Sequence, residues 1–380
     1  MSANPVLYPL DYPADAQDGE LLALDTAILT LRVQARDTAL KQSHTRRIGG
    51  QNAIQVQNKV SKARPVPMPL TQVGLRSIPA VGLQGTMAIL AGGRGHGVST
   101  DTIAFYYSNE SAKPTGVRLS EVRNYMGTIG DSSAGIFAGG IAASGLSATM
   151  DEISYPKMTT RRLGASLTLA RFATAGVGNK DIGVFLGGAK RTDGGMVTNG
   201  EVYTYATGTI QATSLITARQ AAHNGTSNPT DGFIYGGSSD GFVGLQPFTS
   251  IERYNFATRT SNAVGAALSV PHIVHAAFGN KLKGYVAGGL GFVATVSRLT
   301  YSGLTVATVG NLPEGKVCAD GASTNYSGYT FGGDLASTNW QGTRTIDKLG
   351  FASEAIARLG SLLPTPMADQ GAVSDYGAGF

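Results

Sequence analysis

The stretch "GIFAGG" at Gly135–Gly140 recurs along the chain in closely related forms. Its relatives are "AILAGG" at 88–93, "GVFLGG" at 183–188, "GFIYGG" at 232–237, "GYVAGG" at 284–289 and "GYTFGG" at 328–333. The second glycines of successive doublets lie 47, 48, 49, 52 and 44 residues apart. A repeat with this period predicts one small structural unit that the chain uses many times.

Each period carries two further marks. Before the doublet stands a basic residue, and after it comes an aromatic stretch such as "DEISYP" at 151–156 or "GEVYTY" at 200–205. Short apolar or alternating stretches between glycines predict strands, and a glycine doublet suits a turn with positive φ or a close approach of two backbones. Each period therefore predicts four antiparallel strands.

Doublet, aromatic stretch and basic residue together resemble the kelch-repeat β-propellers, whose blades carry a Gly-Gly doublet, a tyrosine, a tryptophan and an arginine that opens the next blade. The resemblance covers roughly residues 75–380, and the blade tryptophan is absent because Trp340 falls in an expected loop. It implies an all-β fold.

The end of the chain bears on the number of blades. "GAVSDYGAGF" at 371–380 aligns with "GASTNYSGYTF" at 321–331, so the last unit has only its first two strands. A propeller must close, because open sheet edges invite aggregation. We predict a seven-bladed kelch-like β-propeller over residues 51–380, with its last blade closed by residues 51–70 and 366–380. A ring of six blades is the alternative.

Residues 1–50 are predicted to form an N-terminal docking arm. Leu21, Leu24, Ile28 and Leu31 have the heptad spacing of a coiled coil, while "LTLRVQA" at 29–35 alternates like a strand. Both patterns need a partner surface. The arm is therefore expected to pack on the propeller rim or to join copies of the chain into a homo-oligomer.

Composition limits the classes of function. With 42% hydrophobic and 14% charged residues the chain can bury a large core, and its net charge of +5 includes no basic stripe of the kind that nucleic acid selects. No apolar run is long enough for a membrane helix, and the N-terminus lacks the order of a signal peptide. Cys318 is the only cysteine, which excludes an intramolecular disulfide and a cysteine-based zinc site.

Candidate catalytic motifs are weak. "GGRGHG" at 92–97 lacks the Lys-Ser/Thr of a P-loop. An acid recurs just before the aromatic stretch, and an acid repeated in every unit is expected to pair with an arginine or cap a turn. These acids are Asp101, Glu152, Glu201, Glu252 and Asp347. We predict no enzymatic activity, no cofactor and no metal site.

The basic residue before each doublet is the candidate ligand-binding position. In kelch adaptors the arginine at this place can face the central pocket, so the resemblance implies an anion-binding ring. The alternative is that each side chain satisfies carbonyl groups between adjacent blades. The series comprises Arg76, Arg123, Arg171, Arg219 and Lys316, with His272 in the remaining place.

Three classes of function remain open. The favoured one is a structural or interaction protein of a bacteriophage virion, in the tail, baseplate or head appendage, that contacts other proteins of the assembly and a host surface glycan or protein. The others are a cytoplasmic kelch adaptor for acidic peptides and a propeller enzyme that acts on sugars. A weakly charged propeller behind a docking arm resembles virion proteins in general build.

Overall fold

The computed structural model describes residues 85–376, apart from residues 96, 192–193, 220–224, 240–246 and 339. The predicted arm, residues 51–70 and Arg76 lie outside this part. The described residues are all-β and contain no helix, and hence none that could cross a membrane.

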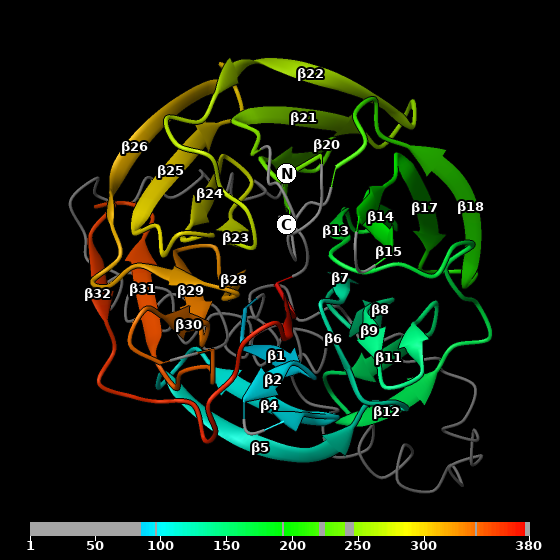
Figure 1. The fold of residues 1–380 in the computed structure, drawn as a ribbon, viewed down its shortest axis with the longest axis horizontal. Coiled ribbons are helices and arrows are strands. Elements are labelled where there is room, and N and C mark those ends of the chain that lie inside the picture. Colours follow the sequence, from blue (N-terminus) through cyan, green and yellow to red (C-terminus); the bar gives the residue numbers. More distant parts are fainter. Residues whose placement is uncertain are drawn as a thin grey trace, which may run out of the picture. The chain divides into compact units, whose positions relative to one another are not determined.

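Six four-stranded antiparallel sheets make up most of the structure (Figure 1). The first three are β33 (Gly371–Ser374), β1 (Met87–Ala91), β4 (Asp101–Tyr106), β5 (Ser111–Arg118); β7 (Gly127–Gly130), β8 (Ala134–Ala138), β11 (Met150–Ser154), β12 (Thr159–Arg162); and β13 (Ala175–Gly178), β14 (Ile182–Leu186), β17 (Asn199–Thr204), β18 (Thr209–Ser214). The others are β19 (Thr226–Ser227), β20 (Asp231–Tyr235), β21 (Ser250–Asn255), β22 (Thr260–Ala267); β23 (Ala276–Gly279), β24 (Lys283–Ala287), β25 (Thr295–Thr300), β26 (Thr305–Asn311); and β28 (Asp320–Ser323), β29 (Ser327–Phe331), β31 (Ile346–Gly350), β32 (Ile356–Arg358).

In four of these units short strands form smaller sheets, from residues between the second and third strands or directly before the first strand. They are β2 (Arg94–Gly95) with β3 (Gly97–Val98); β6 (Arg123–Asn124) with β9 (Ile141–Ala142) and β10 (Gly145–Leu146); β15 (Ala189–Arg191) with β16 (Gly194–Met196); and β27 (Lys316–Val317) with β30 (Asp334–Leu335). They lie next to the glycine doublets of these units, and we call the end of every four-stranded sheet at which its doublet lies the doublet end.

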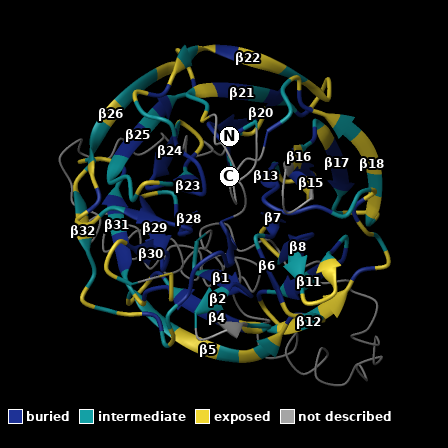
Figure 2. Cartoon of the chain, viewed as in Figure 1, coloured by how far each residue is buried: buried dark blue, intermediate teal, exposed yellow. Residues whose placement is uncertain are grey.

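The six sheets surround a common centre, with the first strand of each nearest the centre (Figure 1). Innermost strands contact one another in the order β7, β13, β19, β23, β28, β33 and again β7. The two middle strands of each sheet are largely buried and the fourth strands carry the exposed residues (Figure 2). The apolar core therefore lies between neighbouring sheets.

The glycine doublets make the closest contacts between sheets. Gly139 has φ 68°, and a Cβ there would lie 2.5 Å from the carbonyl oxygen of Arg171. The amide of Gly140 donates to that same oxygen at 2.9 Å. Each doublet thus reaches the backbone of the next sheet, where a side chain would not fit, which explains why the phrase ends in two glycines.

The first glycine of the phrase has a different neighbour. A Cβ on Gly135 would lie 2.3 Å from Cγ1 of Val373 in the adjacent sheet, and one on Gly328 would lie 1.9 Å from Cδ2 of Phe278. Side chains of the neighbouring innermost strand fill this space. Both ends of the phrase are therefore set by packing between sheets.

The end of the chain completes the first sheet. β33 pairs with β1, and Ser374 lies opposite Ala88. The Asp375 carboxylate accepts hydrogen bonds from the amides of Thr86 at 2.9 Å and Met87 at 3.1 Å. β33 thus supplies the innermost strand of the first sheet, whereas we predicted that residues 366–380 pair with residues 51–70, which are not described.

Glycine packing gives the first test. A Cβ on Gly176 would lie 1.7 Å from the carbonyl oxygen of Thr128, so Gly176→Ala must displace backbone and should lower the free energy of unfolding by about 3 kcal/mol. Gly265→Ala is the control, since nothing lies within 4 Å of its Cβ position, and should be neutral or stabilising by less than about 1 kcal/mol. Chemical denaturation of the full chain measures both, and equal midpoints would contradict this packing.

Candidate functional site

The predicted basic series is buried. Its four described members are at most 1% exposed. Each forms an ion pair with an acid in the third strand of its own sheet, and the acids are buried as well. The pairs are Arg123–Asp151, Arg171–Glu201, Arg219–Glu252 and Lys316–Asp347.

Arg123 shows how such a residue joins two sheets. Its carbonyl oxygen accepts a hydrogen bond from the amide of Gly93 in the preceding sheet at 2.9 Å. Its Nη1 donates to the carbonyl oxygens of Gly139 at 2.9 Å and Thr149 at 2.6 Å in its own sheet. Burial lowers the pKa of the guanidinium, and the Asp151 carboxylate opposes that shift. This geometry favours the structural alternative over an anion-binding ring.

The recurring acids divide into two groups. Glu201, Glu252 and Asp347 belong to the buried pairs, whereas Asp101 and Glu152 pair with the exposed Arg118 and Arg161. In the second sheet the buried acid is Asp151, one residue before the acid that we singled out. Alignment on the tyrosines that follow, Tyr155 and Tyr205, would have identified it.

The fifth sheet has a neutral pair in the same place. His272 Nδ1 lies 2.6 Å from the carbonyl oxygen of Gly288, and its Nε2 lies 3.3 Å from Oγ of Ser297. Burial lowers the pKa of His272, so the imidazole is neutral at physiological pH. A serine replaces the acid because no charge has to be balanced.

Unrepeated polar side chains meet at the doublet end. The Arg94 guanidinium bonds the carboxylates of Asp369 and Asp334, and its Nη2 lies 3.7 Å from Sγ of Cys318. Asp334 also accepts from the amide of Gly342 at 2.7 Å. We call Arg94, Asp334, Asp369 and Cys318 the seam cluster, because Arg94 belongs to the first sheet, Asp334 to the last and Asp369 to the final segment of the chain.

A band of backbone hydrogen bonds supports the seam cluster. In this band a backbone amide donates to the backbone carbonyl oxygen of the neighbouring turn, each time with an N···O distance of 2.9 Å. The donor–acceptor pairs are Tyr125–Asp369, Asp369–Cys318, Cys318–Val274 and Ala173–Tyr125. All five residues have positive φ, between 51° and 61°. Each follows the basic position of its own unit by two residues, so the same left-handed turn recurs around the axis and holds the seam cluster in place.

Two buried carboxylates face one guanidinium in the seam cluster. Burial raises the pKa of Asp369 to about 6, while Arg94 and the Cys318 thiol oppose the shift and Asp334 adds to it. Burial also raises the pKa values of Cys318 and Tyr125. The cluster therefore carries an excess of negative charge that protonation of Asp369 would remove.

An aromatic pair lies beside the seam cluster. The Trp340 ring is 5.8 Å from the Phe292 ring between centroids, and Cζ of Arg94 is 5.7 Å from the indole. The carbonyl oxygen of Trp340 accepts a hydrogen bond from Nη1 of Arg94. Trp340 is 50% exposed, so this side chain links the buried charges to the surface.

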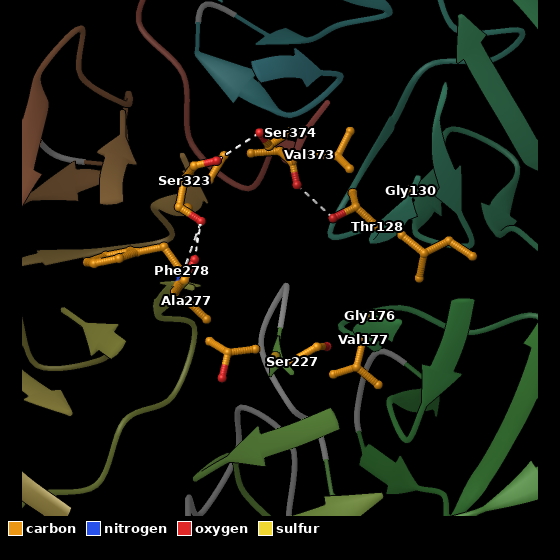
Figure 3. A pocket seen from close by; sticks show the side chains of 17 residues that line it. Thr128, Gly130, Gly176, Val177, Ser227, Ala277, Phe278, Ser323, Val373 and Ser374 are labelled. Carbon is orange, nitrogen blue, oxygen red and sulfur yellow. Dashed lines mark hydrogen bonds between the residues drawn. The ribbon is translucent and has the colours of Figure 1, made fainter. Parts of the chain in front are cut away.

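The innermost strands enclose a small cavity on the axis (Figure 3). Hydroxyl groups bridge neighbouring strands there: Thr128 donates to the carbonyl oxygen of Ala372 at 2.7 Å, and Ser374 to that of Ser323 at 2.8 Å. None of the described residues that line the cavity is charged, and its volume of about 70 Å³ is far below the ~300–1,000 Å³ of small-molecule pockets. It has room for water rather than for a ligand.

Comparison with known proteins does not add to this description. No protein-family model matches the chain, and a search of curated proteins finds no similar sequence.

The buried pairs give a second test. Arg171→Gln leaves Glu201 buried without its cation and should lower the free energy of unfolding by about 3–5 kcal/mol. Arg161→Gln breaks the exposed pair with Glu152 and should cost less than about 1 kcal/mol. Urea unfolding compares the two variants. A small effect of Arg171→Gln would count against a structural role for the series.

The seam cluster predicts a pH dependence. Because the pKa of Asp369 is about 6 when folded and 3.8 ordinarily, the folded state binds an extra proton between these values, and stability from this group rises as pH falls from about 6 to about 4. The free energy of unfolding of the native chain relative to Asp369→Asn should rise by about 2 kcal/mol between about pH 7 and pH 4. Parallel pH profiles for the two proteins would exclude this assignment.

Proposed function

We propose that the six sheets are the blades of a closed β-propeller of the kelch-like type, the six-bladed alternative. The contacts between innermost strands support closure, as does the pairing of β33 with β1. The amide of Gly333 in the last sheet donates to the carbonyl oxygen of Met367 at 2.8 Å, the contact that each doublet makes with the next unit. The seam between last and first sheets thus uses the same interaction as the others.

We further propose that the propeller is a non-enzymatic binding protein of a large assembly, a bacteriophage virion, and that it binds through its doublet end. The observation that carries this proposal is the seam cluster, where unrepeated charges hold a half-exposed tryptophan in a molecule otherwise built from repeats. A repeated feature serves every unit, whereas an unrepeated one serves a single place.

The adaptor alternative has less support. Capture of an acidic peptide by the basic series requires accessible cations, and the described members are buried and paired. The predicted docking arm lies outside the described residues and stays part of the proposal as the means of attachment or oligomerisation.

Selective blocking tests which end binds. Cys318 is buried, so a thiol introduced at Ser337, exposed at the doublet end, can be coupled alone to a polyethylene glycol maleimide. Ser133→Cys is the matched control at the opposite end of a sheet. We expect the unmodified chain to cosediment with gradient-purified virions and coupling at residue 337 alone to abolish attachment. Absence from virions would refute the virion assignment, and equal attachment of both conjugates would refute binding through the doublet end.

A further inference from the structure

The two aromatic residues beside the seam cluster have an unusual backbone. Trp340 has φ 62° and Phe292 has φ 56°, in the left-handed region that disfavours residues with a Cβ. The loops at the same place in the second and third sheets use Gly145 and Gly195 at positive φ. Residues held in such conformations occur at ligand-binding sites as well as in structural turns such as the five around the axis. In these two loops an aromatic residue takes a positive φ close to a glycine that also has one, Gly291 or Gly342.

Trp340 is held in place by the seam cluster. Arg94 bonds its carbonyl oxygen and lies against its ring, and Arg94 is itself held by two fully buried carboxylates. Phe292 contacts the ring with an interplanar angle of 47°. The indole is thus presented in one orientation with half of its surface exposed, which reduces the entropy that a ligand must remove on binding.

The two loops that carry Trp340 and Phe292 are uncharged, and the charges beside the indole are those of the seam cluster. The Trp340 loop, "ASTNWQG" at 336–342, and the Phe292 loop, "LGFVA" at 290–294, contain no charged residue. Arg94 has its donors engaged by Asp334, Asp369 and the Trp340 carbonyl oxygen. Ser337 and Gln341 belong to the same loop as Trp340 and are exposed, neutral hydrogen-bonding residues. This combination suits a ligand with an apolar face and hydroxyl groups, and the described residues of the two loops offer no cation to a phosphate or carboxylate.

We propose that Trp340 and Phe292 form a saccharide-binding platform, on which a pyranose ring of a neutral glycan stacks its C–H face against the indole while Ser337 and Gln341 bond its hydroxyl groups. This proposal rests on the proposed binding role of the doublet end and names the ligand class. A pyranose fits because its axial C–H groups are apolar and its equatorial hydroxyls point sideways toward the flanking residues.

Trp340 is the only tryptophan of the chain, so its fluorescence reports on the platform alone. The full chain is titrated with maltotriose, cellotriose and chitotriose and applied to an array of neutral and sialylated glycans. We expect at least one neutral saccharide to change the emission saturably. Trp340→Gly, whose residue suits φ 62°, should weaken array binding at least tenfold with the melting temperature nearly kept. Trp340→Phe should retain most of it, and Tyr326→Ala, at an exposed aromatic at the opposite end of the last sheet, should bind as the native chain does.

Each result decides the proposal. Absence of saccharide binding, preference for sialylated glycans, or unchanged binding by Trp340→Gly would overturn it. If no saccharide binds but Trp340→Gly still abolishes attachment to virions, the doublet end binds protein and only the glycan class is wrong. If neither saccharide nor virion binding depends on this end, the proposed function fails as well.

Discussion

The fold depends on the residue at the basic position of each unit, which forms hydrogen bonds with two sheets at once. Its carbonyl oxygen accepts a hydrogen bond from an amide of the preceding doublet. Where the residue is an arginine, its side chain also donates to the carbonyl oxygen of the first doublet glycine of its own sheet, as Arg171 does with Gly187 at 2.8 Å and Arg219 with Gly236 at 2.8 Å. The backbone contact needs glycine, and the side-chain contact needs a buried donor. Burial of so many cations is costly unless each has an acid, which is why acid and base recur together.

Sequence reasoning could predict the repeated part of the structure because each unit repeats the same physical problem. The spacing of the doublets identified units that are four-stranded sheets, and the apolar run of "GIFAGG" correctly indicated a strand buried on both faces. The spacing of the repeat could not predict that the basic residues are buried. An arginine that faces a pocket and an arginine that bonds carbonyl groups between sheets have the same spacing, and only the position of Asp151, Glu201 and Glu252 in space separates the two interpretations.

The seam could not be predicted because it obeys no repeat. Alignment of the chain end with residues 321–331 correctly suggested a first strand, but it did not indicate that β1 would be its partner. In the first sheet the basic position is taken by Met367, and Asp101 lies exposed instead of in a buried pair. Arg94 and Asp369 form a different ion pair nearby, so the seam also pairs a buried acid with a cation, here partly exposed, but from other positions of the unit.

The seam between the first and last sheets is also the place where a surface with no counterpart in other units can form with the least disturbance of the repeated contacts. A side chain in a repeated position has equivalent neighbours in the other units. Arg94, Asp334 and Asp369 instead contact one another because the first sheet, the last sheet and the final segment of the chain lie together. Their bonds fix the carbonyl oxygen and the ring of Trp340. The charges that hold the last segment of the chain therefore also orient the most exposed aromatic side chain among the described residues. Stability of the seam and geometry of the proposed platform are thus one property of the same few side chains.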